Sequence, residues 1–253
     1  MSVVKKVIIG VVLYCGFMLA LFPASVALQL APLPQGISVS GVSGTIWSGK
    51  ANLVALQQRQ LESVQWQLSP WGLLSGRANI DFAIGSRATA VNGKGQVSLS
   101  MSGINAQGLR FEAPSAFLIG KTRLPFRAEV DGHFSVIVQQ LEQGLPWCEQ
   151  LNGKLFVQQL QVNNQFGKYP LGNIELGLSC VDGNIQLATD ETMNALGLTG
   201  NALLKDNKLI ALSAKIKETP AQPEDLKQAL SFLGKRDSQG YYPISFQGRI
   251  PGI

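Results

Sequence analysis

The sequence has little charge and almost no histidine. Only 15% of its 253 residues are Asp, Glu, Lys or Arg, and His133 is the only imidazole. The net charge of +5 includes Lys5 and Lys6, and the remaining charges are scattered. This distribution excludes the basic stripe or cluster expected of a nucleic-acid surface. A hydrophobic content of 45% excludes a disordered chain, so we expect a globular protein with no nucleic-acid partner.

Motifs of catalysis are also missing from the sequence. It contains no GxSxG, P-loop, HExxH or EF-hand loop. A Ser-His-Asp site would have to use His133, which alternates with strand residues in VDGHFSVIV. The neighbouring carboxylates Asp190 and Glu191 carry no mark of an acid/base pair. We therefore predict a non-enzymatic protein without a catalytic, cofactor or metal site.

No charged residue occurs in a long stretch near the N-terminus, between Lys6 and Lys50. Its apolar part, residues 7–28, would measure about 33 Å as a helix, enough to cross a bilayer core. Positive charge in front of this part and none directly behind it predicts a cytoplasmic N-terminus. We expect a single-pass protein of a bacterial inner membrane, with a cytoplasmic tail at 1–6, a transmembrane anchor at 7–28, a linker at 29–40 and a periplasmic β-rich domain at 41–253.

A cleaved secretory signal is the alternative interpretation of this segment. Ser25 and Ala27 form the small-x-small pair of a cleavage site, and Pro23 would end the apolar core early. Both interpretations deliver the same body to the same compartment.

The three cysteines fit that compartment. Cys15 lies in the apolar segment, where it is expected to pack as a small hydrophobic residue. Cys148 and Cys180 lie in the exported body, and an oxidising periplasm would join them in a disulfide. Two free buried thiols are the alternative. A zinc site is disfavoured because the chain has one histidine and no CxxC motif.

Apolar and polar residues alternate over most of the body. This period of two is typical of antiparallel strands with one buried face. The clearest apolar sets are Ala78, Ile80, Phe82 and Ile84; Val97, Leu99 and Met101; Ile174, Leu176, Leu178 and Cys180; and Ile210, Leu212, Ala214 and Ile216. Five dipeptides predict turns between strands: Asn92-Gly93, Asp131-Gly132, Asn152-Gly153, Asp182-Gly183 and Asp206-Asn207.

Signals for helices are few. Residues 219–234 contain Pro223 and two acidic residues where a helix would begin, then an apolar stripe and Gly234. The segment SPWGLLSG is long enough for one turn and is expected to connect two strands. We predict a mainly β protein, with an N-terminal transmembrane helix followed by an elongated, curved antiparallel β-sheet body with one or two short helices.

Trp47 lies between Gly44 and Gly49 in the stretch GVSGTIWSG. We predict that residues 45–48 form a short strand and that the glycines allow a positive φ or a bulge. Trp47 is then interpreted as a core side chain for which the two glycines leave space. A ligand contact is the alternative role.

The stretches VSGTIWSGKA, WQLSPWGLLSGRANIDF, LPWCEQLNGKLFVQQL, ELGLSC and YYPISFQGRI resemble the type II secretion system protein N family (general secretion pathway protein N). The resemblance covers nearly the whole chain. It implies an accessory or scaffold subunit, anchored in the inner membrane, of the machinery that exports folded proteins across the outer membrane. Its partners would be other inner-membrane and periplasmic subunits, and Cys148 and Cys180 match the family's cysteine pair. No catalytic residue is carried over. The residues that we expect in the structural core are Gly44, Trp47, Gly49, Trp66, Pro70 and Trp147.

A second resemblance is confined to about 40 residues. The pattern Trp66-x-Leu68-x-Pro70 followed by Leu74-x-Gly76 is similar to repeats of AsmA/TamB-like periplasmic proteins, and this resemblance implies an open β groove that carries lipid. Lipid binding or transfer is therefore the alternative function. The two functions differ in whether a set of strand residues lines a covered core or an open trough: Ile80, Phe82, Val97, Leu99, Leu176 and Leu178.

Overall fold

The computed structural model describes residues 3–30, 33–57, 59–86, 88–120, 128–165, 167–206 and 209–249. The N-terminal segment forms two helices, α1 (Val3–Ala20) and α2 (Ala24–Leu30). Pro23 lies between them, where its ring disfavours helical backbone at the preceding residue. The predicted anchor at 7–28 is therefore divided, and within the described residues α1 is the one helix long and apolar enough to cross a membrane.

The described residues contain fourteen strands in one antiparallel sheet, which confirms the predicted fold class. Neighbours in the sheet follow chain order from β1 through β3 to β14, and β2 pairs with β3 alone. The strands are β1 (Ile37–Ser40), β2 (Ser43–Gly44), β3 (Ser48–Leu56), β4 (Arg59–Leu68), β5 (Arg77–Ile84), β6 (Asn92–Ser100), β7 (Gly103–Pro114), β8 (Glu129–Gln143), β9 (Cys148–Asn164), β10 (Gly167–Val181), β11 (Asn184–Thr189), β12 (Leu198–Leu204), β13 (Leu209–Ile216) and β14 (Tyr242–Arg249). The sheet thus starts at Ile37, inside the predicted linker at 29–40.

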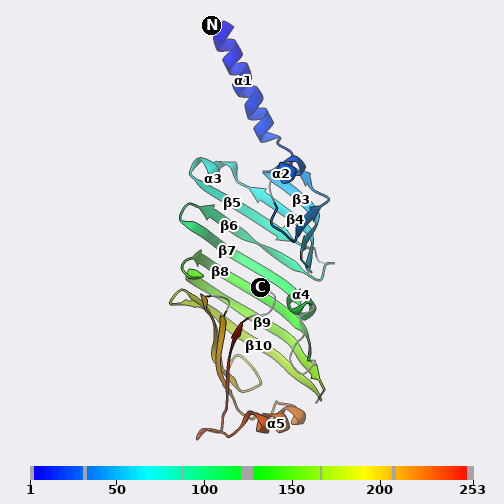
Figure 1. Cartoon of the computed structure of the whole chain (residues 1–253), viewed down its shortest axis with the longest axis vertical. Coiled ribbons are helices and arrows are strands. Elements are labelled where there is room, and N and C mark those ends of the chain that lie inside the picture. The colour runs from blue at the N-terminus through cyan, green and yellow to red at the C-terminus, as the bar shows by residue number, and fades with distance from the viewer. Residues whose placement is uncertain are drawn as a thin grey trace.

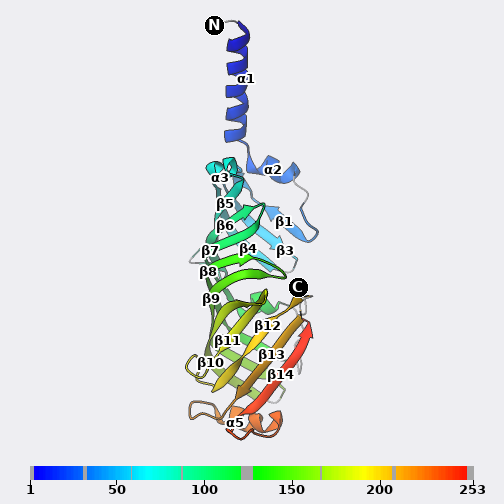
Figure 2. The same ribbon diagram turned by 90° about the vertical axis from the view of Figure 1, so that its left-hand side faces the viewer.

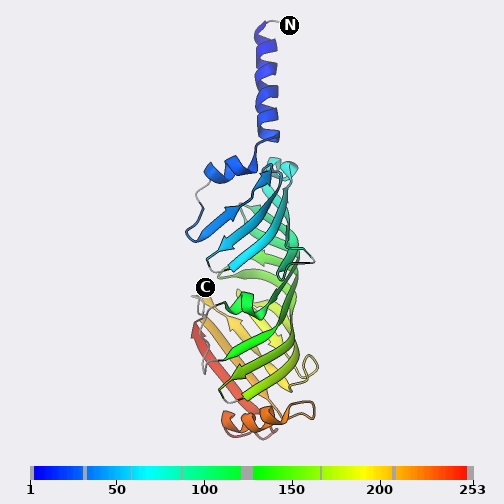
Figure 3. The same ribbon diagram turned by 90° about the vertical axis from the view of Figure 1, so that its right-hand side faces the viewer.

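The molecule is elongated, and α1 projects from one end of the sheet (Figure 1). The strands cross the long axis one after another, and the sheet twists and curves along its length (Figures 2 and 3). This shape follows from the right-handed twist between neighbouring strands, which accumulates over an open sheet.

Short helices lie at the ends and edges of the sheet. α3 (Pro70–Leu74) connects β4 to β5, as expected for SPWGLLSG. α5 (Glu224–Leu230) continues into a 3-10 turn, η3 (Ser231–Leu233), and forms the predicted late helix at the end far from α1 (Figure 1). α2 lies mostly within the predicted anchor at 7–28 but forms a separate helix, and α4 (Ser115–Ile119) was not predicted.

Register gathers apolar side chains on one side of the sheet, here called the apolar face. Residues in register across neighbouring strands form continuous rows, because directly opposed residues point to the same face. One row comprises Leu68, Ile80, Val97, Ala106, Leu141 and Leu151 from β4 to β9. A second comprises Leu178, Leu187, Ala202, Leu212 and Phe246 from β10 to β14. Polar residues form the matching row on the opposite face: Asn79, Ser98, Asn105, Glu142 and Gln150.

The buried core is small and lies at the end of the sheet far from α1. Leu196, Ile216, Leu230 and Tyr242 form its buried cluster, and Leu226 of α5 packs against it. α5 therefore covers the apolar face at this end. Along the other strands most apolar residues are half-buried, so the ladders of backbone hydrogen bonds hold much of the sheet together.

The predicted turns are only partly correct. Asp182-Gly183 forms the β10–β11 turn, with φ of 50° and 77°. Asn92-Gly93, Asp131-Gly132 and Asn152-Gly153 lie inside strands β6, β8 and β9, so these three predictions are wrong. The second lies where the β8–β9 register shifts, because the same dipeptides that suit turns also suit bulges. Of the fifth dipeptide, Asn207 is outside the described residues.

Candidate functional site

Trp47 lies at the junction between α1 and the sheet. Its Nε1 donates a hydrogen bond to the Leu19 carbonyl near the end of α1, at 2.8 Å. The N–H of Leu68 donates to the Trp47 carbonyl at 2.7 Å. The predicted strand at 45–48 is wrong, because residues 45–47 form the turn between β2 and β3 and only Ser48 belongs to a strand. Trp47 is half-buried and links a helix to β4, outside the buried cluster.

Gly49 provides space for Trp66 and not for Trp47. Gly49 and Trp66 face each other across β3 and β4, and a Cβ on Gly49 would lie 2.3 Å from Cζ2 of the Trp66 ring. The Trp66 indole donates its Nε1 hydrogen to the Ile46 carbonyl at 3.2 Å. The Ile46 N–H in turn donates to the Phe22 carbonyl at 3.1 Å. Two half-buried tryptophans therefore tie the 45–47 turn to the N-terminal segment and to the sheet.

Gly44 and Pro70 were predicted as core residues, and this was wrong because both are exposed. Gly44 has φ of 89°, a conformation that residues with a side chain rarely adopt. Pro70 is the first residue of α3, where a missing N–H costs nothing and the fixed φ suits the helix. Backbone conformation, and not burial, accounts for these two residue types.

A second group of contacts between strand connections surrounds the cysteine pair. Cys148 and Cys180 are joined by a disulfide of 2.08 Å, and Cys148 is almost fully buried. Trp147, which is half-buried, donates its Nε1 hydrogen to the Lys205 carbonyl at 3.0 Å. The N–H groups of Trp147 and Cys148 both donate to the Gly183 carbonyl. The turn between β8 and β9 is thereby fixed to the β10–β11 turn and to the end of β12.

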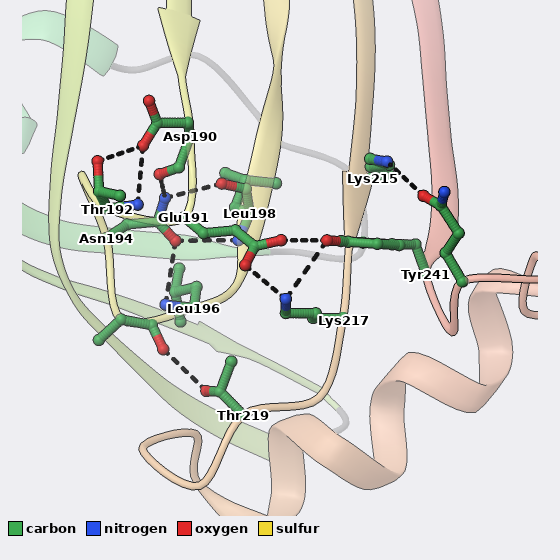
Figure 4. A network of polar contacts seen from close by, with 12 residues as sticks. Asp190, Glu191, Thr192, Asn194, Leu196, Leu198, Lys215, Lys217, Thr219 and Tyr241 are labelled. Carbon is green, nitrogen blue, oxygen red and sulfur yellow. Dashed lines mark hydrogen bonds and ion pairs between the residues drawn. The ribbon is translucent and has the colours of Figure 1, made fainter.

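A network of polar contacts holds the connection between β11 and β12 (Figure 4). Glu191 accepts hydrogen bonds from Lys217 of the connection after β13 and from the hydroxyl of Tyr241 next to β14. The Asn194 amide donates to the Leu198 carbonyl at 2.8 Å, and its oxygen accepts the Leu198 N–H at 3.0 Å. No local pattern in the sequence predicts this network, because the partners of Glu191 lie 26 and 50 residues away.

The electrostatics of this network indicate a structural role. The hydrogen bond from Lys217, followed by that from Tyr241, lowers the pKa of the Glu191 carboxyl. The same contact with Glu191 raises the pKa of Lys217. Both groups are thus held in their charged forms at neutral pH, and neither is poised to transfer a proton. The pair fixes the 190–197 connection beside the buried core.

A depression of about 410 Å³ lies on the polar face of β5, β6 and β7, between Arg77 and Asp81. Four amides, one hydroxyl and two apolar residues complete its lining: Asn79, Gln96, Asn105, Gln107, Ser98, Ile80 and Val97. The hydroxyl of Ser98 donates to the Asn79 amide oxygen at 2.8 Å, and an amide cannot act as the base that a serine nucleophile requires. The depression offers hydrogen bonds without an activated nucleophile. Among the described residues, no group of three His, Cys, Asp or Glu is placed to hold a metal ion.

The apolar face is only partly covered. Of the six residues chosen to distinguish a core from a trough, five are half-buried and Leu99 is 39% exposed. Phe246 on the last strand is 57% exposed. α4 packs over part of this face, where the Phe117 ring lies 6.0 Å from Phe111. Arg59 of β4 donates to the Leu118 carbonyl of the same helix at 2.7 Å.

In the described part of the chain, these features define a class of protein, a single antiparallel sheet attached to one exposed apolar helix. The family described as type II secretion system (T2SS), protein N, matches residues 35–245. The chain belongs to this family and is therefore a subunit of the type II secretion machinery.

Curated relatives match over almost the whole chain, and each is named type II secretion system protein N. The Aeromonas hydrophila protein is 32% identical over 97% of this chain and 99% of its own length. The Vibrio cholerae protein is 31% identical over 90% of this chain and 91% of its own length, and the Pectobacterium carotovorum protein is 22% identical over 96% of both. No solved structure matches the chain.

Proposed function

We propose that this subunit acts as a non-enzymatic scaffold of type II secretion, held by α1 in the inner membrane with its sheet in the periplasm. Its N-terminus, with Lys5 and Lys6, lies in the cytoplasm. In this role it positions other inner-membrane and periplasmic subunits by non-covalent contact and needs no cofactor.

One geometric observation carries the proposal, the extension of a single sheet away from a single apolar helix. Among the described residues, thirteen strands follow one another in the ladder. Since neighbouring strands lie about 4.8 Å apart, the ladder measures roughly 60 Å along its curve. A rigid body of this length can hold contact surfaces at a set distance from the membrane. Its outermost strands, β1 and β14, and the exposed side of α5 are the surfaces best suited to protein partners.

The test compares a clean deletion with strains that carry the full chain or a chain whose α1 is replaced by a cleavable signal. Secreted enzyme activity and co-purification with inner-membrane secretion subunits are measured in each strain. The scaffold predicts that the full chain restores both and that the released body restores neither. Full function of the released body would contradict an anchored scaffold.

Lipid binding is a second candidate, which the exposure of Leu99 and Phe246 on the apolar face favours. A photo-reactive amino acid at Leu99 distinguishes the two functions, with Lys154 on the polar face as the matched position. A lipid carrier predicts lipid adducts at Leu99 and a leaky outer membrane in the deletion strain. A scaffold predicts no more lipid adducts at Leu99 than at Lys154, normal lipid integrity and impaired secretion.

A further inference from the structure

Exposed apolar side chains project from α3 at the end of the sheet that adjoins α1. Trp71 is 79% exposed and Leu74 is 81% exposed, and Leu73 between them is 44% exposed. No charged residue occurs from Leu68 to Gly76. We propose that α3 lies in the surface of the bilayer that α1 crosses, with Trp71 and Leu74 inserted among the lipid head groups. This inference rests on the proposed anchor and adds a second membrane contact, which fixes the orientation of the sheet.

Trp71 differs from the other tryptophans of the chain. Trp47, Trp66 and Trp147 are half-buried, and each donates its indole hydrogen to a backbone carbonyl. Within the described residues, the Trp71 indole has no such acceptor. An indole with an apolar body and a free N–H is favoured at a membrane–water boundary, where both parts find suitable surroundings.

The exposed position of Trp71 is built into the fold. α3 is pinned to β5 by the Ser69 N–H, which donates to the Asn79 carbonyl at 2.9 Å. On its inner side Gly72 is buried so closely that a Cβ would lie 2.6 Å from the Arg77 carbonyl oxygen. The Ser75 hydroxyl closes the turn on the Gly72 carbonyl at 2.8 Å. The helix therefore has a fixed inner side, and its apolar residues are held outward.

Hydrogen bonds also fix the height of α3 relative to α1. Trp47 bonds to Leu19 near the end of α1 and to Leu68, two residues before α3 begins. In all three views α3 lies level with α2, next to the end of α1 (Figures 1–3). α2 presents the uncharged residues Val26 and Leu30 to solvent on the other side of α1. The end of α1 is thus flanked on two sides by uncovered apolar side chains.

The length of α1 places this end of the sheet at the bilayer surface. After Lys6, the apolar part of α1 extends from Val7 to Ala20, which is about 21 Å at 1.5 Å per residue. A bilayer core is about 30 Å thick, and a short span is accommodated by local thinning or by drawing its flanking residues toward the core. The segment directly after Ala20, which contains α2 (Ala24–Leu30), is therefore drawn to the interface. α3 lies level with α2, so it is placed at the same depth (Figures 1–3).

The experiment places an environment-sensitive dye at Leu74 of the full chain, as Leu74→Cys in a Cys15→Ser background with the disulfide intact. Met101→Cys and Leu145→Cys are the matched controls, because both residues are fully exposed apolar residues in strand turns farther from α1. Each labelled chain is reconstituted in vesicles of phosphatidylethanolamine and phosphatidylglycerol, some of which carry a nitroxide lipid. We expect a blue shift and strong nitroxide quenching at position 74, and neither at positions 101 and 145.

The outcomes separate this inference from the proposed anchor. Chains that remain in the vesicles, with position 74 as unquenched as position 101, would overturn the α3 contact and leave the anchor intact. Chains that fail to associate with vesicles would overturn both. In a second measurement, Trp71→Ser combined with Leu74→Ser should leave thermal unfolding in detergent unchanged and remove the vesicle-dependent blue shift of a dye at Leu73→Cys. A persistent shift in that variant would also contradict the inference.

Discussion

Gly49→Ala tests whether Trp66 determines how the sheet is joined to α1. The added methyl would lie 2.3 Å from Cζ2 of Trp66 and 2.9 Å from the Thr45 carbonyl oxygen. Neither atom is the end of a flexible chain, because the indole is a rigid ring and the carbonyl belongs to the backbone. The ring must therefore move, and its hydrogen bond to Ile46 is lost with it.

The cost of this substitution can be estimated from its parts. Forcing an extra methyl group into a packed site costs about 1–3 kcal/mol. The lost hydrogen bond contributes about 1 kcal/mol more. Replacing glycine also reduces the conformational freedom of the unfolded chain, and this offsets the cost by stabilising the folded state by about 0.4–1 kcal/mol. We therefore expect Gly49→Ala to lower the free energy of unfolding by about 1–3.5 kcal/mol.

Gly177→Ala is the matched control for denaturant unfolding of the full chain in detergent. Gly177 is also a strand glycine without a positive φ, and its Cβ would meet only the Ala188 carbonyl oxygen at 3.8 Å. Like Gly49→Ala, this variant reduces the conformational freedom of the unfolded chain, but its new methyl group meets no close atom. It should therefore be as stable as the parent or slightly more stable. In a Trp66→Leu background the cost of Gly49→Ala should fall. Equal stability of the two alanine variants, or an unchanged cost in that background, would refute the reasoning.

Three further predictions concern the rest of the sheet. Leu230→Ala should lower unfolding free energy by about 2–5 kcal/mol because Leu230 is buried in the core, whereas the exposed Phe232→Ala should change it by less than about 0.5 kcal/mol, both measured in urea. Cys180→Ser should cost about 3–4 kcal/mol, because the disulfide closes a loop with a sequence separation of 32, and parent and variant should unfold alike once a reductant is present. The hydrogen bond from Lys217 lowers the pKa of Glu191 from its ordinary value of 4.5. The ionised Glu191 therefore stabilises the fold above pH 4.5, and this contribution is lost as the pH falls through the lowered pKa. Glu191→Gln should therefore be less stable than the parent at pH 7, and this difference should shrink in acid-unfolding curves below pH 4.5.

Alternation of apolar and polar residues was sufficient to predict the antiparallel sheet. In β5 the set from Ala78 to Ile84 faces one side, and its partners in β6 continue the same rows. Such a pattern is local, so a single sequence contains it. Met101 shows its limit, because it continues the alternation of β6 and lies in the turn after that strand, fully exposed.

Contacts between distant residues could not be predicted in this way. Gly49 was predicted to make room for Trp47 two residues away, and this was wrong, because the ring that it accommodates is that of Trp66 across the strand pair. Similarly, Asn152-Gly153 suits a turn locally, yet it continues β9 because a Cβ on Gly153 would lie 2.6 Å from the Ile137 carbonyl oxygen of β8. In each case the deciding neighbour belongs to another strand.

The two ends of the sheet depend on different kinds of interaction, and this bears on how the protein can be altered. Near α1, indole hydrogen bonds from Trp47 and Trp66 fix one arrangement of helix and strand, and such contacts have strict geometry. At the far end Leu230 and Tyr242 pack in a small apolar cluster, which tolerates exchanges that conserve volume. Most positions of the strands between them require only alternation and register, apart from the Cys148–Cys180 disulfide and close backbone contacts such as that of Gly153. The proposed scaffold therefore needs particular residues next to α1, at the disulfide and at its far end, while most other strand positions can vary in sequence as long as the two faces of the sheet are kept.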